Sequence, residues 1–347
     1  MTTIPRKNED RGRGHNPSIW AFILIALGVI WLLFEAKILS GANLAVLFRL
    51  WPIVLIAFGL ELLFGRSSRM ISLAIGAATI VLLLLLMAVG PALGLAPSAE
   101  VKTAQYSELV GEATSAQVNL DLSVGKATVQ ALSDSDKLID ADLRYVGDVN
   151  FKVTNSGSEK AVVLNAKNDS VQWFNFLGLS LNSGQDENDL RWNIGLSPNL
   201  PLDLRLSGGV GESTLDLSGL QLTRLSYNSG VGDTTVSLPG SGSYSVDFNG
   251  GVGKLAVNFA EGAAVNANVD AGVGEITLDV PDDAPVRLKA DGGLGGINVP
   301  ANFIRVSGED NGLNRNGEWE SASYSSADDN ARITIDFNGG VGSLTVK

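Results

Sequence analysis

Four ten-residue stretches decide the fold: GGVGESTLDL at 208–217, SGVGDTTVSL at 229–238, GGVGKLAVNF at 250–259 and AGVGEITLDV at 271–280. Each begins at a turn with a central Val between glycines and continues as a strand-like alternation of apolar and polar residues. The central apolar residue recurs at a fixed spacing of 21 positions, at Val210, Val231, Val252, Val273 and Leu294. A fixed period of this length indicates a repeat architecture, in which each repeat buries its apolar face only against its neighbours.

Apolar residues alternate with period two on both sides of the turn, which predicts two short strands per repeat. Positions eight, six and four before the central residue are apolar, as are positions five and seven after it; Leu202 and Leu204 precede one turn, and Leu215 and Leu217 follow it. The glycines supply turn conformations that other residues adopt only at a cost. We therefore predict an all-β domain, a β-solenoid with 21-residue, two-strand coils.

The same motif extends the repeat towards both ends of the domain. Val124 in LSVGKATV and Val146 in RYVGDVNF are separated by one period plus one position. Val341 in FNGGVGSLTV follows Leu294 by two periods plus five positions. We expect this register to run through most of residues 97–347 with small insertions. We also expect turn geometry, burial in the core and hydrogen bonds between coils to account for the glycines, the valines and the Asx residues.

A short polar residue stands three positions before each central residue. The row consists of Ser207, Asn228, Asn249, Asp270, Asp291 and Asn338. Stacked side chains of this kind form a hydrogen-bonded ladder, and we favour that interpretation over an oxygen-ligand calcium site. The nonapeptide calcium-binding repeat has a different period. The sequence therefore predicts neither a metal site nor a cofactor.

Composition changes sharply near Pro97. The residues before it carry eight Lys/Arg and four Asp/Glu, whereas those after it carry 17 Lys/Arg and 33 Asp/Glu, a net charge of −16. Such an acidic domain, without a basic stripe, repels phosphate backbones, and this excludes nucleic acid as a partner. The chain has no cysteine and one histidine, His15, in its N-terminal tail. Thiol and imidazole chemistry are therefore excluded from the β domain.

Three apolar runs precede the β domain and predict about three transmembrane helices, at residues 19–39, 44–64 and 70–95. Residues 1–18 form a basic tail that we expect to be disordered. Six Lys/Arg in the tail and between the second and third runs, against two in the first loop, place the N terminus inside and the β domain outside. We predict a multi-pass protein of the plasma membrane, with the lipid bilayer as a partner.

Two segments interrupt the repeat, near residues 171–192 and 308–330. Aromatic side chains outside a repeat act as end caps, as loop packing or as a platform for a ligand, and packing is the commonest of these roles. An exposed aromatic cluster is nevertheless where a partner would bind. The candidates for partner contact are Trp173, Phe174, Phe176, Trp192, Trp319 and Tyr324.

The sequence contains no catalytic motif. Parallel β-helix lyases and hydrolases have coils of nearly this length, but glycoside hydrolysis needs two converging carboxylates and elimination needs a base with cation support. The row six places after the turn reads Asp216, Ser237, Asn258 and Asp279, with no two neighbouring acids. We predict that the protein has no catalytic residues and is not an enzyme. Polysaccharide processing remains a remote alternative.

Two parts of the chain resemble known families. Residues 50–60, LWPIVLIAFGL, lie between Gly28 and Gly65 and resemble the LiaI/LiaF-type transmembrane region of bacterial cell-envelope proteins. Residues 200–204, LPLDL, followed by GGVGESTLDL, resemble the toast-rack β domain of the DUF2154/DUF4097 type, a family of adhesin-like β-solenoids. The first resemblance implies regulation, since LiaF-like proteins are associated with restraint of a sensor kinase of the envelope-stress response.

The resulting hypothesis is a non-enzymatic, membrane-anchored cell-envelope protein that senses, regulates or scaffolds the envelope-stress response through an extracytoplasmic β-solenoid. A membrane sensor kinase or a component of the cell envelope is the expected partner. The alternative hypothesis is a surface adhesin or structural stalk, for which the solenoid supplies stiffness.

Overall fold

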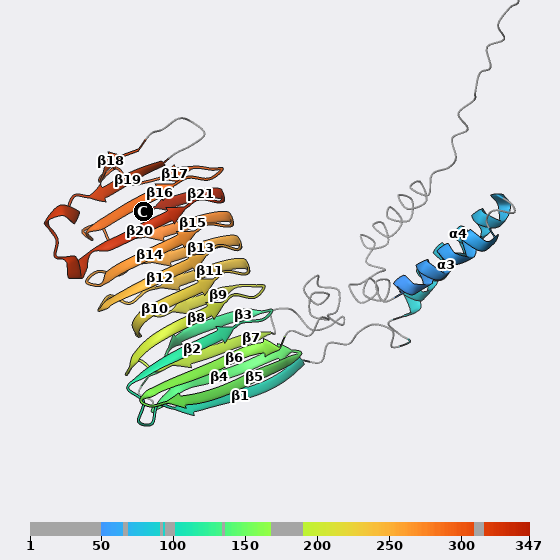
Figure 1. The fold of residues 1–347 in the computed structure, drawn as a ribbon, viewed down its shortest axis with the longest axis horizontal. Coiled ribbons are helices and arrows are strands. Elements are labelled where there is room, and N and C mark those ends of the chain that lie inside the picture. Colours follow the sequence, from blue (N-terminus) through green and yellow to red (C-terminus); the bar gives the residue numbers. More distant parts are fainter. Residues whose placement is uncertain are drawn as a thin grey trace, which may run out of the picture. The chain divides into compact units, whose positions relative to one another are not determined.

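The computed structural model describes residues 50–64, 69–90, 93, 101–133, 136–167, 190–308 and 316–347. The chain divides into two compact units, which Figure 1 draws as ribbons. The described α-helices lie in the first unit, within Met1–Ser98, and the described strands lie in the second, which begins at Ala99. The predicted tail, residues 1–18, and the first predicted span, residues 19–39, lie outside the described residues.

The first unit contains the helices α3 (Trp51–Phe64) and α4 (Arg69–Val89), which contact each other. Pro52 stands in the first turn of α3, where its missing N–H costs no helical hydrogen bond. The N–H of Gly90, just past the end of α4, donates to the carbonyl oxygen of Leu86 at 2.7 Å. Among the described residues we find no helix with the combined length and hydropathy of a membrane crossing.

The second unit is mainly β, and two large mixed sheets enclose one common core. In the described part of the chain, sheet A has ten strands and sheet B has eleven. The order across sheet A is β1 (Val101–Leu109), β4 (Lys137–Val146), β7 (Arg191–Leu196), β3 (Lys126–Ala131), β9 (Ser213–Asp216), β11 (Val231–Ser237), β13 (Val252–Asn258), β15 (Val273–Asp279), β21 (Val341–Val346) and β17 (Ile297–Asn298). The order across sheet B is β18 (Phe303–Ser307), β19 (Asn316–Ser321), β16 (Val286–Asp291), β20 (Ile333–Asn338), β14 (Ala264–Asp270), β12 (Ser243–Asn249), β10 (Gln221–Asn228), β8 (Pro201–Ser207), β2 (Ser115–Asp121), β6 (Glu159–Lys167) and β5 (Asp148–Ser156).

The chain alternates between the sheets: a strand of sheet B leads through a glycine turn to a strand of sheet A, and the next coil follows. The strands of successive coils pair in parallel. In sheet B, β12 lies between β10 and β14 and pairs with both. In sheet A, β13 lies between β11 and β15 and pairs with both. Partners stand one full period apart in the sequence, as in the pairs Leu225–Val246 and Val236–Val257. This register confirms the predicted two-strand coil and its period.

The core lies between the sheets and is built from the apolar columns that the sequence predicts. Val246 and Phe248 of β12 point inward, as does Val257 of β13, and each is at most 1% exposed. Burial of each such side chain stabilises the fold by about 1.5–3 kcal/mol. Tyr244 is also buried, and its hydroxyl donates to the carbonyl oxygen of Pro239 at 2.6 Å, so the polar end of the ring stays satisfied.

The coils are not stacked in sequence order at either end of the unit. The C-terminal coil, β20–β21, lies between the earlier coils β14–β15 and β16–β17, and Figure 1 shows these red strands beside orange ones on both sides. Likewise β2 pairs in parallel with both β6 and β8. The turns at Val124, Val210–Val273, Val341 and Leu294 therefore share one row, but their order in space differs from their order in the sequence. Val146 pairs with Val101 in an antiparallel ladder and takes no part in the row of turns.

Antiparallel strands close both sheets at one end of the stack and sheet B at the other, where sheet A ends with the parallel strand β17. β1 pairs with β4 and β5 pairs with β6 at one end, whereas β18 and β19 pair at the other. Lys160 is fixed beneath the first cap, because its Nζ donates to Glu108 Oε1 at 2.8 Å and to the Leu109 carbonyl oxygen at 2.7 Å.

Candidate functional site

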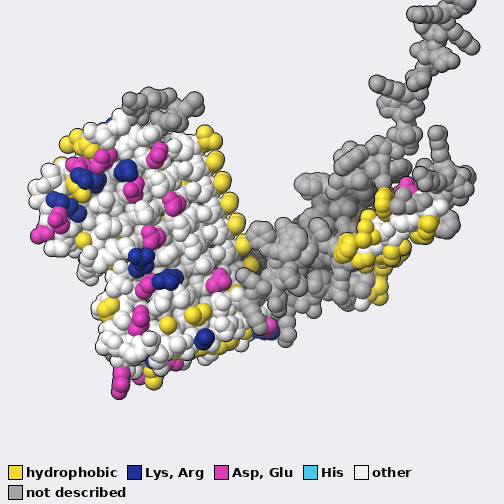
Figure 2. Space-filling view, viewed as in Figure 1, with side chains coloured by type: hydrophobic (Ala, Val, Ile, Leu, Met, Phe, Trp, Pro, Cys, Tyr) yellow, Lys and Arg dark blue, Asp and Glu magenta, His cyan; other side chains and the backbone are white. Residues whose placement is uncertain are grey.

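A continuous row of apolar side chains runs along the corner where the chain passes from sheet B to sheet A. Successive members are β-bridge partners in neighbouring coils, and we call the row the valine ridge. In spatial order it consists of Val124, Val210, Val231, Val252, Val273, Val341 and Leu294. Figure 2 shows the row as a regular line of hydrophobic side chains at one edge of the unit. Val252 and Val273 are 50% and 51% exposed, and Leu294 is 69% exposed.

The expectation that burial in the core accounts for these valines is therefore wrong, and the parity of the strand explains why. In β11 the buried residues are Thr234 and Val236, so alternation turns Gly232 inward and Val231 outward. The sequence contained this signal. The apolar residues five and seven places after the ridge residue lie at odd distances from it. Side chains at odd and even distances point to opposite faces of a strand, so a strand that buries the former exposes the ridge residue.

Around Val252 glycine is required on both sides of the ridge residue. Gly253, which follows Val252, has a φ of 134°, in a region that is open almost exclusively to glycine. Gly251, which precedes Val252, lacks a positive φ but lies against the neighbouring coil, where an added Cβ would overlap the carbonyl oxygen of Gly230. The ladder also satisfies the backbone, since the N–H of Val252 donates to the same Gly230 oxygen at 3.0 Å.

Small residues make a shelf beside the ridge. From Val210 onward, the two residues before each ridge residue are Gly, Ser or Ala, for example Gly250 and Gly251 before Val252. We call this strip the glycine shelf. A hollow of about 40 Å³ is lined by shelf and ridge residues of successive coils. This space holds about one water molecule, so the corner presents a ridge and a shallow step rather than a deep pocket.

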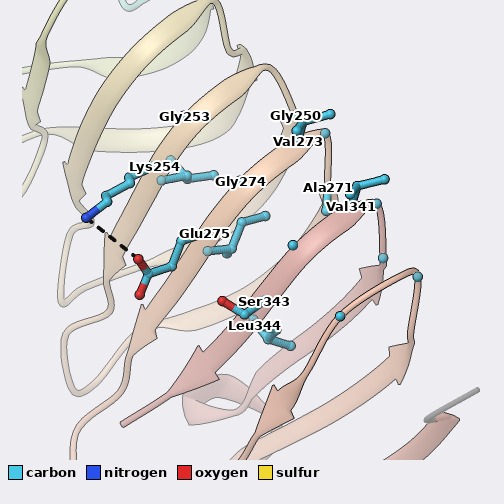
Figure 3. Close-up of a pocket in the computed structure, with 18 of the residues that line it drawn as sticks. Gly250, Gly253, Lys254, Ala271, Val273, Gly274, Glu275, Val341, Ser343 and Leu344 are labelled. Carbon is cyan, nitrogen blue, oxygen red and sulfur yellow. Dashed lines mark ion pairs between the residues drawn. The ribbon is translucent and has the colours of Figure 1, made fainter. Parts of the chain in front are cut away.

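A charged row follows the ridge on the side of sheet A. It occupies the position after the second glycine in five of the turns and consists of Lys126, Glu212, Asp233, Lys254 and Glu275; the turns of Val341 and Leu294 have Ser343 and Gly296 there. Figure 3 shows the Lys254 and Glu275 side chains from neighbouring strands, with the ion pair drawn between them. The Nζ–Oε2 distance in this pair is 3.7 Å, and the Lys126–Glu212 distance is 3.2 Å. Pairs this exposed contribute about 0–1 kcal/mol.

The predicted polar row lies on the other side of the shelf and forms hydrogen bonds between coils. Asn249 Nδ2 donates to Asn228 Oδ1 at 2.8 Å, and Asn338 Nδ2 donates to Asp270 Oδ1 at 2.8 Å. These bonds support the ladder interpretation. In the residues that the structure describes, no group of three or more His, Cys, Asp or Glu side chains is placed to hold a metal ion.

The ladder extends beyond the predicted row. Asp121 faces Ser207 and Asn165 in the parallel pairings of β2. Burial raises the pKa of Asp121 above its usual value, because desolvation disfavours the charged carboxylate. Next to it, Asn150 Nδ2 donates to Asn165 Oδ1 at 3.1 Å. Asp121 stands three positions before Val124 and therefore belongs to the same column, so the sequence contained its signal, whereas Asn165 and Asn150 lie outside the register of the repeat.

The aromatic residues predicted as partner contacts have different surroundings. Trp173, Phe174 and Phe176 lie outside the described residues. Trp192 is 1% exposed and its ring centroid lies 6.2 Å from that of Tyr145, so its side chain offers no surface to a partner.

Trp319 and Tyr324 belong to the cap at the C-terminal end of the stack. Trp319 is partly buried against the core, with Arg305 Cζ 5.3 Å from the ring centroid. Tyr324 is 7% exposed, and its ring is contacted by Arg287 Cζ at 4.5 Å and Arg332 Cζ at 5.1 Å. Cation–π contacts of this kind contribute about 0.5–2 kcal/mol each.

Arg287 connects this cap to strand β16. A hydrogen bond from Arg287 to Glu320 raises the pKa of the guanidinium, and Tyr324 and Glu318 act in the same direction. The Nε–Oε1 distance to Glu320 is 2.8 Å. Tyr324 begins the 3₁₀ turn Tyr324–Ser326, and a second turn follows at Asp329–Ala331. The described part of the insertion near 308–330 therefore includes a cap with internal contacts.

A comparison of the sequence with protein families gives one match for the β unit. Residues 97–258 match the family described as the N-terminal domain of toast_rack, DUF2154. The predicted resemblance to this family is thus confirmed for these residues. The match does not include residues 50–60, so the resemblance of that segment to a LiaI/LiaF-type region stays a prediction. None of the curated proteins matches the chain.

The chain is also similar to solved structures. A structure from Clostridium sporogenes ATCC 15579, described as a "putative cell adhesion protein", is 23% identical, with a TM-score of 0.50; the similarity covers 72% of this chain and 99% of that one. A structure from Bacteroides fragilis NCTC 9343, described as a "putative adhesin", is 14% identical over the same shares, with a TM-score of 0.25. Only the first superposition is close enough to bear on the fold.

Proposed function

We propose that the chain is a non-enzymatic, membrane-anchored protein of the bacterial cell envelope, whose β unit stands outside the membrane as an adhesin-like module on a stiff stalk. The observation that carries this proposal is the unbroken parallel register of the central coils. A repeated coil gives a rod that presents the same rows of side chains at every level. Eleven strands in sheet B, at about 4.8 Å per interval, correspond to a rod of roughly 48 Å.

The adhesin-like role is supported by the solved structure from Clostridium sporogenes, whose whole length is spanned by the similarity. That protein is described as a "putative cell adhesion protein", and our proposal extends the same role to this chain. A module for attachment needs a rigid surface held away from the membrane. Register-locked strands with capped ends meet this need, because each coil is held by ladders on both sides.

Anchoring in the membrane is part of the proposal and rests on the apolar runs of the sequence. These runs, 19–39, 44–64 and 70–95, extend beyond the described helices. Large apolar side chains are exposed on α3, including Ile56 at 63% and Leu63 at 75%. A lipid environment would cover such side chains, and water disfavours them by about 25 cal/mol per Å². The distribution of Lys and Arg in the loops supports a location of the β unit on the outer side.

A regulatory role is the second candidate. The resemblance of residues 50–60 to the LiaI/LiaF-type region supports it, and a membrane sensor kinase would then be the partner. Under this alternative, the β unit senses the state of the envelope and the helices transmit the signal. Polysaccharide processing remains a remote third alternative, since it needs a pair of converging acidic side chains.

Protease treatment of intact cells tests the location of the β unit. We expect an external protease to remove the unit from cells that carry the full chain, with a cytoplasmic protein as the control for lysis. Protection of the unit until lysis would contradict the proposal.

Attachment assays separate the first two candidates. Cells with the full chain are compared with cells that carry residues 1–98 alone, for adhesion to host or envelope surfaces and for an envelope-stress reporter. Loss of attachment with an unchanged reporter supports the adhesin-like role. Unchanged attachment with an altered reporter would replace it by the regulatory role.

A further inference from the structure

The C-terminal coil lies between two coils that precede it in the sequence. In sheet B, β20 pairs in parallel with β14 on one side and with β16 on the other. In sheet A, β21 lies between β15 and β17 in the same way. We propose that the β unit has a second stacking, in which the C-terminal coil is released and the coils β14–β15 and β16–β17 pair directly with each other.

The two coils on either side of the C-terminal coil already share one register. Val265 of β14 and Val286 of β16 both pair with Ile333 of β20. In sheet A, Ile276 of β15 and Ile297 of β17 both pair with one residue of β21. Each of these two pairs is separated by 21 positions, which is the spacing of direct partners in the regular part of the repeat. A direct ladder between the two coils therefore needs no change of register.

The connection between β15 and β16 is as short as a connection between adjacent levels. Leu278 and Val286 are eight positions apart in the sequence, and so are Val257 of β13 and Val265 of β14. Val257 and Leu278 are partners in sheet A, so the two connections begin at equivalent positions. The connection from β13 to β14 rises one level of the stack, whereas that from β15 to β16 rises two. Its length therefore suits the direct stacking without added residues.

The two edges that the C-terminal coil joins are complementary to each other. The Ala271 N–H donates to the Asn338 carbonyl oxygen at 2.8 Å, and the Asp291 carbonyl oxygen accepts a bond from the turn after β20 at 2.6 Å. One coil earlier, the equivalent groups bond directly, from the Gly250 N–H to the Asp270 carbonyl oxygen at 2.6 Å. Release of the C-terminal coil leaves one edge with the free donor and the other with the free acceptor. Unpaired strand edges of this kind favour pairing with each other.

Burial and contacts in the cap favour the stacking that Figure 1 shows. Arg332, directly before β20, contacts the Tyr324 ring, and its Nη2 donates to the Ala327 carbonyl oxygen at 2.8 Å. The direct stacking is therefore adopted when the C-terminal coil cannot dock, and the two packings share one register, as two packings of one sequence do in proteins that switch fold. The C-terminal coil buries five apolar side chains, each at most 4% exposed, at Ile333, Ile335, Phe337, Leu344 and Val346.

Pairs of introduced cysteines distinguish the two stackings, because the chain has no cysteine of its own. Asn268 of β14 and Lys289 of β16 are exposed, and both pair with Asp336 of β20. With β20 between them, their Cα atoms are two strand intervals apart, roughly 9.6 Å, whereas a disulfide needs a separation below about 7 Å. The control pair is Asp247→Cys with Asn268→Cys, since β12 and β14 are neighbours in both stackings.

The test measures how fast each disulfide forms in the full chain. The chain is held in detergent micelles with a mild oxidant, and the linked peptides are followed by mass spectrometry. Ile335→Asp places a charge at a buried position of β20 and releases the C-terminal coil. In this variant we expect the disulfide between Asn268→Cys and Lys289→Cys to form at least about tenfold faster, because only the direct stacking brings the two Cα atoms within reach. The control disulfide should form at an unchanged rate.

A second variant keeps the test decisive if Ile335→Asp also slows the control disulfide. Arg332→Ala removes the contacts to Tyr324 and Ala327 and leaves the core free of charge, and it should accelerate the same disulfide to a smaller extent. An unchanged rate in a variant with a normal control disulfide would overturn the proposal. Equally fast formation without either substitution would also overturn it, since the C-terminal coil would then not separate β14 from β16. These measurements do not depend on the proposed membrane anchor or on attachment.

Discussion

Replacement of Gly253 by alanine tests the physical basis of the repeat. Gly253 has a φ of 134°, and an added Cβ would overlap the carbonyl oxygen of Gly232 in the neighbouring coil. Backbone strain of this kind costs about 1–3 kcal/mol. Forcing an extra carbon into a packed structure costs about another 1–3 kcal/mol. We therefore expect Gly253→Ala to lower the free energy of unfolding by roughly 2–6 kcal/mol, the sum of the two costs.

Two matched variants separate strain from overlap. Gly242 has a φ of 89° but nothing lies within 4 Å of an added Cβ, so Gly242→Ala measures strain alone. Gly251 has no positive φ but an added Cβ would overlap the Gly230 oxygen, so Gly251→Ala measures overlap alone. The assay is urea unfolding of the full chain in detergent micelles, followed by circular dichroism, with midpoint and slope compared. If Gly253→Ala were no more destabilising than Gly242→Ala, the argument for close approach of the coils would fail.

Three further predictions concern buried and stacked polar groups. Tyr244→Phe leaves the Pro239 oxygen without its donor and should cost about 1–3 kcal/mol at neutral pH. Burial raises the pKa of Tyr244 in the folded state. The contribution of the Tyr244 hydroxyl to stability is therefore complete below the usual pKa of about 10 and is lost as the pH rises above it. With increasing alkaline pH, the urea midpoint should fall less steeply in Tyr244→Phe than in the unmodified chain. Burial also raises the pKa of Asp121, whose charged form therefore opposes folding. Asp121→Asn should raise the urea midpoint at pH 7, and the gain should disappear below about pH 4, where both residues are neutral. Asn249→Ala removes the bond to Asn228 and should cost about 0.5–1.5 kcal/mol in the same assay, and no loss would show that the ladder adds no stability.

The coil was predictable from the sequence because period and alternation are local properties. The regular spacing of the turns fixes which residues become partners, as with Val236 and Val257. The order of the coils was not predictable in this way. Every Gly-Val-Gly turn offers the same hydrogen bonds to its neighbours, so no local feature of the sequence determines which turns become neighbours. Val341 lies between Val273 and Leu294 in the structure.

The candidate site was predictable only in part. The polar ladder followed from one column of the repeat, and the exposure of the ridge could have been derived from parity. Burial of Trp192 also had a local signal, since Trp192, Ile194 and Leu196 alternate with period two and all are buried. The surroundings of Tyr324 had none. Arg287 lies far before Tyr324 in the sequence, and only the fold of the cap brings the guanidinium over the ring.

The last coil of the chain lies inside the stack and not at its end. In a simple solenoid the terminal coil contacts one neighbour and can detach without affecting the rest. Here β20 pairs with β14 on one side and with β16 on the other, and β21 pairs with β15 and β17. The C-terminal strands β20 and β21 are therefore interior strands of the two sheets. Their loss would remove pairing partners from the coils β14–β15 and β16–β17. A rod closed in this way should resist fraying at that end, which is the property that a spacer or an attachment module needs.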